Sequence, residues 1–470
     1  MNVRRWILLP LLATLLAVAA ACGDDEETTT PAAEATSAAA EPATSAPAED
    51  TAAASETAAA TEDTAAASDT AAAEDTAAAS DGASTAAAPS GDPILIGIAA
   101  AKTGIISPFD IEPAQAFELA VEEINAAGGV LGRPLTTEWV DTKSDPALAA
   151  SIADELVGKG AVAVLATCDF DFGSPAATSA NAAEVIGFSL CASDPKFADT
   201  TTIGPYAFSM GSGTDVKGSA AGEWAYNQKG WRKAYLLQDE LLEYTKSLGR
   251  YWKQRFEDLG GEVVGEDTFT GNEALDPSPN VSRLRDAAGD ADVIVLPSVV
   301  PAAATMLRAI RDAGIETPVF MPGAAVDGTL VTGAIPDISN FYSEPYACMP
   351  AYCSGEDNPK LVEFTDKFEA KYGAQPTLSY PVAGYDLAYV LKMAIESAGA
   401  TDGPALKTAI ETMPETEMLS GSIVFSATCH KPIRRPHAFV EYQGGKGTFI
   451  ERYRVEQIAD VGDNNPCAKE

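Results

Sequence analysis

Two histidines, His430 and His437, are the only imidazole side chains in the chain, and both lie in the polar segment 429–437. Nucleophilic catalysis needs a Ser or Cys beside a base that a third group orients. Neither histidine belongs to a recognisable triad motif, and the sequence has no Walker-type phosphate loop. Acid pairs for glycoside hydrolysis have no sequence signature. We therefore predict that the protein is not an enzyme, and we expect no cofactor and no metal.

Cys22 follows a segment that is typical of an export signal. Arg4 and Arg5 form a positively charged start, residues 6–18 are apolar, and small residues lead up to Cys22. The apolar run is short for a membrane span, and acidic residues follow it directly. The pattern resembles the bacterial lipobox, in which the cysteine is lipidated and becomes the new N-terminus. We expect a lipid anchor on Cys22 at the extracytoplasmic face of the cell membrane; an ordinary secretory signal is the alternative.

The segment 23–92 consists almost wholly of Ala, Thr, Ser, Pro, Asp and Glu. It contains 16 acidic residues, no Lys or Arg, and no aromatic or large aliphatic side chain. Such a composition cannot bury a core, and its charges repel one another. We predict a disordered, extended acidic linker, with a glycosylated stalk as the alternative.

The chain from Pro93 onward is acidic as well, with 52 Asp and Glu against 29 Lys and Arg. Binding to nucleic acid requires clustered Lys and Arg, so a nucleic acid partner is excluded. This part of the chain is too long for one ordinary domain, and its length suits two lobes.

Apolar runs of strand length alternate with helix-length segments along this part of the chain. The first series consists of predicted strands 94–98, 136–140, 162–166 and 185–190, with helices 114–127, 147–159 and 176–184. The second consists of helices 216–227, 245–259, 281–288 and 302–313, with strands 234–237, 262–269, 293–296 and 319–321. Continuous apolar strands between helices indicate an α/β fold with a parallel sheet covered on both faces. Two series indicate two such lobes, with a ligand cleft at the carboxyl ends of the strands.

Several blocks of sequence carry a resemblance to a known family. They are Ile96-Gly97-Ile98, AVEEINAAGGVLGRP at 120–134, DTKSDP at 141–146, MLRAIRDAG at 306–314, PVFM at 318–321 and GYD at 384–386. In this order they resemble the branched-chain amino acid (Leu/Ile/Val) binding proteins, substrate-binding lipoproteins of ABC transporters with the type I periplasmic binding fold. The similarity spans residues 93–455.

The resemblance implies two doubly wound parallel-sheet lobes joined by a hinge of three crossovers. Lobe 1 would comprise 93–211 and 345–430, and lobe 2 would comprise 212–344 and 431–470. It also implies that the lobes close on a small molecule, amino acid-like or a related polar solute, and that an ABC permease with its ATPase subunits receives this ligand. A tethered sensor that signals to a membrane receptor is the alternative function, and a stalk with a vestigial cleft is another.

The resemblance further indicates the ligand site, where this chain departs from the amino acid binders. In those proteins a serine-rich loop after the third strand and a hydroxyl after the fourth hold the ligand carboxylate. Here the loops read CDFDFGS at 168–174 and CAS at 191–193, so Ser193 keeps the hydroxyl. A family tyrosine matches Tyr244, while the acid that pairs with the ligand ammonium matches Ala324.

Two hypotheses remain for the acids of the first loop. In one, Asp169, Asp171 or Asp327 receives a cationic or polyhydroxylated solute between aromatic walls. In the other, Asp169 and Asp171 cap the helix that follows, where the N-terminal dipole favours acids. The predicted ligand-binding residues are Phe109, Asp169, Phe170, Asp171, Cys191, Ser193, Tyr244 and Asp327, and Phe172 is a further aromatic wall.

Without Cys22 the chain has six cysteines, which permit 15 pairings. Extracytoplasmic chemistry allows disulfides. With the loops placed by the resemblance, the favoured pairs are Cys168–Cys191, Cys348–Cys353 and Cys429–Cys467. The family often bridges the first cysteine to an upstream position that is Ser144 here. Zinc binding is disfavoured because the sequence has no paired C-x-x-C spacing.

Overall fold

The computed structural model describes residues 88–323, 329–463 and 465–469. The predicted export signal, Cys22, most of the predicted linker, and Asp327 therefore lie outside the described residues. In the part that is described, no helix is long and apolar enough to cross a membrane.

The first sheet is wholly parallel and has the strand order β2-β1-β3-β4-β5. Its strands are β1 (Ile94–Ala100), β2 (Leu135–Asp141), β3 (Ala163–Ala166), β4 (Ile186–Ser189) and β5 (Ala207–Ser209). Its helices are α1 (Ser107–Ala126), α2 (Pro146–Gly158), α3 (Phe170–Ala182), α10 (Pro381–Ala398) and α11 (Gly403–Glu411), and α9 (Pro359–Tyr372) packs beside α1. These helices cover both faces of the sheet. Successive side chains of a strand point to opposite faces, so neighbouring residues pack against different helices. Ile96 and Ile98 of β1 pack with α1 and α10, whereas Ala99 packs with α2 and α3.

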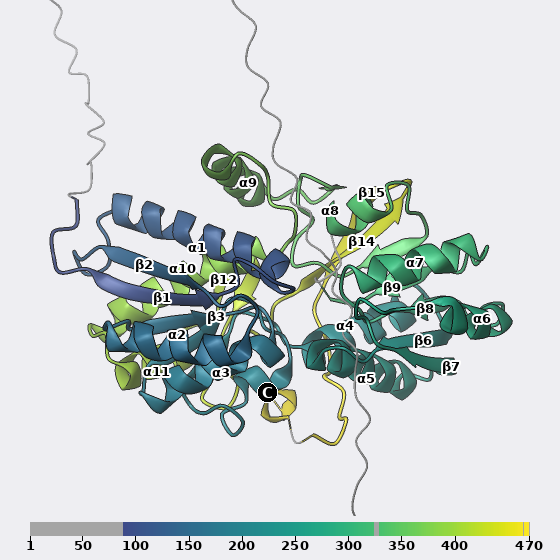
Figure 1. The fold of residues 1–470 in the computed structure, drawn as a ribbon, viewed down its shortest axis with the longest axis horizontal. Coiled ribbons are helices and arrows are strands. Elements are labelled where there is room, and N and C mark those ends of the chain that lie inside the picture. Colours follow the sequence, from purple (N-terminus) through teal and green to yellow (C-terminus); the bar gives the residue numbers. More distant parts are fainter. Residues whose placement is uncertain (1–87, 324–328, 464, 470) are drawn as a thin grey trace, which may run out of the picture. The chain divides into compact units, whose positions relative to one another are not determined.

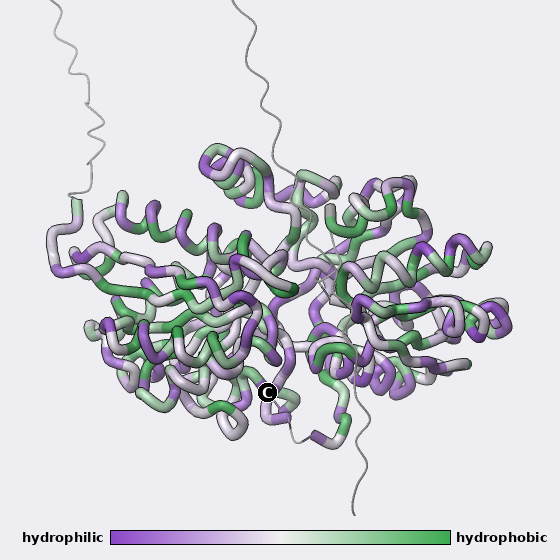
Figure 2. Tube along the Cα trace, viewed as in Figure 1, coloured by the Kyte–Doolittle hydropathy of each residue, from purple (hydrophilic) through white to green (hydrophobic). Residues whose placement is uncertain are grey.

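The second sheet has eight strands in the order β11-β15-β14-β10-β9-β8-β6-β7. Its strands are β6 (Lys233–Asp239), β7 (Glu262–Phe269), β8 (Val293–Val295), β9 (Val319–Met321), β10 (Phe341–Ser343), β11 (Cys353–Ser354), β14 (His437–Gln443) and β15 (Lys446–Tyr453). The associated helices are α4 (Thr214–Asn227), α5 (Glu243–Asp258), α6 (Ser278–Ala287), α7 (Ala302–Asp312) and α8 (Thr329–Ala334). Figure 2 shows hydrophobic residues along the central strands and hydrophilic residues on the outer turns of the helices.

The chain passes between the two sheets three times (Figure 1). It does so after β5, after β11, and between the short hairpin of β12 (Thr416–Met418) and β13 (Gly421–Ile423) and strand β14. This arrangement confirms the predicted α/β class with two parallel-sheet lobes. We call the part around the first sheet lobe 1 and the part around the second lobe 2. The lobe boundaries predicted along the chain remain a prediction.

The structure differs from the predicted elements at several places; helix α3, for example, begins at Phe170 and not at Ala176. Strands β14 and β15 run antiparallel, joined by Gly444 and Gly445, whose φ angles are 56° and 75°. A pair of positive-φ residues is what a two-residue hairpin requires. Helix α1 begins at Ser107 and not at Ala114, so Pro113 lies inside the helix although it lacks the N–H for an intrahelical bond.

Candidate functional site

A small cavity lies between the two lobes at the carboxyl ends of their strands. It is lined from lobe 1 by Ile106, Phe109, Cys168, Asp169, Cys191 and Tyr380, and from lobe 2 by Leu242, Tyr244 and Val299. Its volume is only about 20 Å³. That is room for about one water molecule. The lobes are thus closed on their own side chains, and a solute enters only if they separate.

Asp169 lines this cavity and also begins helix α3. Its Oδ1 accepts the backbone N–H groups of Asp171, at 2.8 Å, and of Phe172, at 3.3 Å. Burial, with a smaller contribution from the neighbouring Asp171 carboxylate, raises the pKa of Asp169 to about 7. One oxygen of Asp169 therefore caps helix α3, and the same side chain also forms part of the cavity wall.

Phe170 and Asp171 do not line the cavity. Phe170 packs with the core beneath α2 and α3 and lies 5.7 Å from the ammonium of Lys196. Asp171 lies where the lobes meet, because its Oδ2 accepts the backbone N–H of Glu243 in lobe 2 at 3.0 Å. Phe172 is half-buried against the core of lobe 1.

Ser193 and Cys191 follow strand β4, on the loop next to that of Asp169. Ser193 is buried, donates to the carbonyl of Cys191 at 3.1 Å, and accepts a hydrogen bond from Lys217 Nζ at 2.9 Å. Cys191 is bonded to Cys168, so a disulfide forms part of the cavity wall. The other bonded pairs are Cys348–Cys353 and Cys429–Cys467, and all three pairs are those predicted.

The remaining predicted site residues are aromatic or lie outside the described chain. Phe109 and Tyr244 both line the cavity, from opposite lobes. Asp327 is outside the described residues, so its place in the site stays a prediction.

Sequence reasoning missed the most polar side of the site, which surrounds Lys217. This lysine of α4 is fully buried, and its Nζ lies 4.5 Å from the ring centre of Tyr346, 5.5 Å from that of Tyr380 and 5.7 Å from that of Tyr244. Tyr380 sits at the start of α10, almost 200 residues from the predicted loops in sequence. No local motif marks either residue.

Buried charges also occupy the crossovers between the lobes. His437 Nδ1 lies 2.6 Å from Glu344 Oε1, and both residues are fully buried. Burial raises the pKa of Glu344 well above its usual value and lowers that of His437 well below. Uncharged Glu344 and His437 are therefore the favoured forms. Lys431 makes two 2.7 Å hydrogen bonds to Asp215 at the start of α4.

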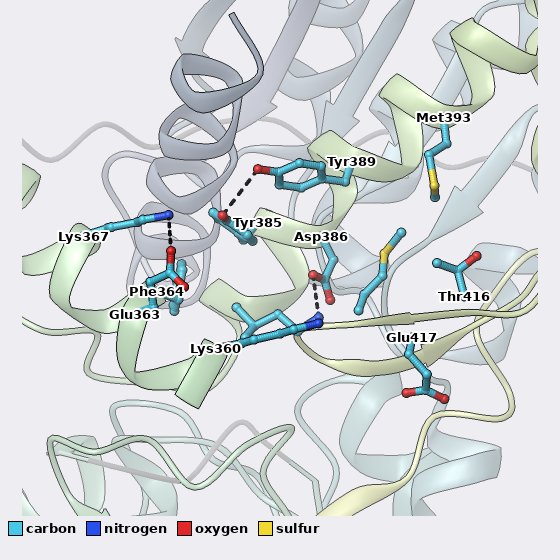
Figure 3. Close-up of a pocket in the computed structure, with 12 residues that line it drawn as sticks. Lys360, Glu363, Phe364, Lys367, Tyr385, Asp386, Tyr389, Met393, Thr416 and Glu417 are labelled. Atoms are coloured by element: carbon cyan, nitrogen blue, oxygen red, sulfur yellow. Dashed lines mark hydrogen bonds and ion pairs between the residues drawn. The ribbon is translucent and has the colours of Figure 1, made fainter. Parts of the chain in front are cut away.

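A larger cavity, of about 370 Å³, lies within lobe 1 among α9, α10 and the β12–β13 hairpin. Figure 3 shows Tyr385 and Tyr389 of α10 on one side and Lys360, Glu363 and Lys367 of α9 on another. The hydroxyls of Tyr385 and Tyr389 are both hydrogen-bonded to Glu123. Among the described residues, only those of lobe 1 line this cavity, so the two lobes do not face each other across it. In the described part of the chain, no group of three or more His, Cys, Asp and Glu side chains is arranged to hold a metal ion.

The family model for periplasmic binding proteins matches residues 93–447, and the chain belongs to this family. Its members are solute-binding proteins and not enzymes, which confirms the prediction made from the histidines and motifs. The chain is 25% identical over 367 residues to "Leu/Ile/Val-binding protein homolog 2" of Brucella abortus (strain 2308), covering 75% of this chain and 91% of that protein.

Solved structures share the fold. One is the branched-chain amino acid transporter substrate binding protein LivJ from Streptococcus pneumoniae in complex with isoleucine, with a TM-score of 0.65 and 23% identity over 76% of this chain and 99% of that chain. Another is a solute binding protein of an ABC transporter from Rhodopseudomonas palustris BisB5 in complex with 3,4-dihydroxy benzoic acid, with a TM-score of 0.65 and 19% identity over 79% of this chain and 99% of that chain. They confirm the type I periplasmic binding fold.

Proposed function

We propose that this protein captures a small solute in the cavity between its lobes and delivers it to an ABC permease and its ATPase subunits. Lipid on Cys22 would hold it at the extracytoplasmic face of the membrane. The solute is amino acid-like or a related polar molecule, and the candidate contacts that line the cavity are Phe109, Asp169, Cys191 and Tyr244, with Ser193 beside them. The names of the relatives support this class of solute, since one such protein holds isoleucine and another an aromatic acid.

The observation that carries the proposal is the lining of the cavity by both lobes. A ligand shifts the balance between open and closed forms only by its greater affinity for one of them. Groups that face each other across the lobes provide that difference, because they meet only on closure. Besides the bond from Asp171 to lobe 2, Ser247 of α5 donates to Asp194 of lobe 1 at 2.8 Å.

A binding screen with an uptake assay tests the proposal. A thermal-shift screen of amino acids, polyamines, sugars and aromatic acids should find a stabilising ligand, since a ligand at 100 times its Kd contributes about 2.7 kcal/mol. Deletion of the gene should abolish uptake of that ligand. Retained uptake with intact binding would instead support the tethered sensor.

The lipid anchor is tested separately. The Cys22→Ser variant should move from the membrane to the soluble fraction and lose incorporation of labelled fatty acid, whereas a Ser90→Ala change in the predicted spacer should not. A Cys22→Ser protein that remains in the membrane would contradict the anchor.

A further inference from the structure

We propose that the solute is an organic anion, a carboxylate on an apolar or aromatic body without an ammonium group, and that Lys217 holds its carboxylate. The inference rests on the proposed function, because it names the substrate class of the same cleft.

Lys217 lies behind the cavity wall, next to tyrosine rings from both lobes. Tyr244 and Tyr380 line the cavity, and the Lys217 ammonium lies 5.7 Å and 5.5 Å from their ring centres. Ser193, on the lobe 1 loop, fixes the ammonium from the other lobe by accepting one of its protons at 2.9 Å. A ligand oxygen therefore reaches this ammonium only if the two tyrosines move.

Lys217 has no counter-ion among the described residues, although it is fully buried. Lys431 provides the internal contrast, because it is 2% exposed and is neutralised by Asp215. An isolated buried charge is costly, and a buried cation normally has a partner. Among the described residues, Lys431 thus has an acidic partner and Lys217 has none, which suits Lys217 to pairing with the carboxylate of a ligand.

Glu344 is the buried acid whose charge acts on Lys217, but its oxygens are engaged elsewhere. Oε1 lies 2.6 Å from His437 Nδ1, and Oε2 accepts the backbone N–H of Gly323 at 3.1 Å. Burial also raises the pKa of Glu344 well above its usual value, which favours the neutral acid. Glu344 does not replace the missing counter-ion.

A second buried cation strengthens the positive field. Arg435 is 1% exposed, its Cζ lies 4.7 Å from the Tyr346 ring centre, and its Nε and Nη2 have no hydrogen-bond acceptor among the described residues. Burial raises the pKa of Tyr346, but the charges of Lys217 and Arg435 outweigh this and lower it from its usual value. Two cations that act on one hydroxyl create a field that attracts an anion.

The rest of the cavity offers little to an ammonium. Its described walls are mainly apolar and aromatic, and the one acid among the described lining residues is Asp169, whose Oδ1 already accepts two N–H groups of α3. Burial raises the pKa of Asp169 to about 7, so this carboxyl is only partly charged at neutral pH. The described walls of the cavity are thus mainly apolar and aromatic, and two buried cations lie behind its tyrosines.

Isothermal titration of the purified full chain with matched probes tests the substrate class. The carboxylates are 4-methylpentanoate and benzoate, the neutral analogues are 4-methylpentanamide and benzamide, and the zwitterion is L-leucine. We expect at least one carboxylate to bind, and its amide and L-leucine to bind at least about 30-fold more weakly, as for the loss of one partner of a buried charge pair. This measurement needs no variant that must fold.

The Lys217→Met variant tests the residue. It should weaken binding of the carboxylate at least about 30-fold and leave binding of the amide within about threefold. The unliganded variant should melt no lower than the parent chain, because an unpaired buried charge is removed. Lys229→Met is the matched control, since Lys229 also lies over an aromatic ring, that of Tyr342 at 4.4 Å, but over none of the rings that line the cavity.

The outcomes separate this inference from the proposed function. If the amides or L-leucine bind as tightly as the carboxylates, or if Lys217→Met leaves carboxylate affinity unchanged, the inference is overturned while solute capture stands. The same holds if only cationic or sugar ligands bind. If the whole screen finds no ligand of any class, the proposed function itself fails.

Discussion

Replacing Asp215 by Asn should destabilise the protein strongly, because it leaves Lys431 buried without a counter-ion. Asp215 is fully buried, and both its oxygens lie 2.7 Å from Lys431 Nζ. Asn465 Nδ2 donates a further bond to Asp215 at 2.5 Å. The carboxylate therefore joins the start of α4, the third crossover and the C-terminal segment.

The magnitude follows from the burial of both partners. Removing one partner of a buried pair costs about 3–5 kcal/mol, whereas replacing both by neutral groups is often close to neutral. Asp215→Asn and Lys431→Met should each lower the free energy of unfolding by about 3–5 kcal/mol. The double variant should lose less than either single variant, so the cycle gives a coupling energy of about 2 kcal/mol or more.

Urea unfolding, followed by tryptophan fluorescence and far-UV circular dichroism, measures these differences. Lys159→Met is a suitable control, since its pairs with Glu138 and Glu155 are exposed and surface pairs contribute about 0–1 kcal/mol. Single variants that lose less than about 1 kcal/mol, or a double variant whose loss equals the sum of the two, would refute the reasoning.

Three further predictions concern the cleft. Burial raises the pKa of Asp110 to about 7. A carboxyl whose pKa is raised in the folded state stabilises the fold below about pH 4, and this stabilisation is lost as the pH rises to 7. Asp110→Asn should therefore flatten the fall in the free energy of unfolding between these pH values. Replacing Cys168 and Cys191 by Ala should cost about 2–4 kcal/mol and weaken ligand binding, with intact pairing of the parent chain checked by peptide mapping; unchanged stability would contradict a structural bond. Asp171→Ala removes the acceptor of the Glu243 N–H and should weaken ligand affinity by about 1 kcal/mol, mainly through faster dissociation. Stopped flow measures the dissociation rate, and an unchanged rate would count against a contact that stabilises the closed form.

The sequence predicted strands β1–β4 and β6–β9 because the signal for them is local, but it predicted no strand at β5, β10, β11, β14 or β15. The predicted strand at 262–269 corresponds to β7, and the pattern at 302–313 corresponds to α7 within one residue. The start of α1 was missed because Pro113 reads as a helix boundary, whereas tertiary contacts extend the helix to Ser107. Asp110, in that extra turn, accepts the backbone N–H groups of Ala101 and Cys168 at 2.7 Å each.

The site was predictable only where it lies on loops after strands. The CDFDFGS and CAS loops follow β3 and β4, so the positions of Asp169 and Cys191 at the cavity follow from topology. Lys217 lies on a helix among buried residues, and its ring neighbours come from three distant segments. Which buried cation has a counter-ion depends on contacts across hundreds of residues, and no spacing rule conveys that.

The Cys429–Cys467 bond has a consequence for the use of this protein as an optical sensor. It fastens the C-terminal segment to the third crossover, and Val216 of α4 packs against the bond. A reporter attached beside Cys467 is thus held next to the third crossover, where we expect closure to change angles more than distances. Dyes for distance-based readout are better placed far from this crossover, for example at the turn of Gly444 between β14 and β15 and on the exposed Leu131 that precedes β2.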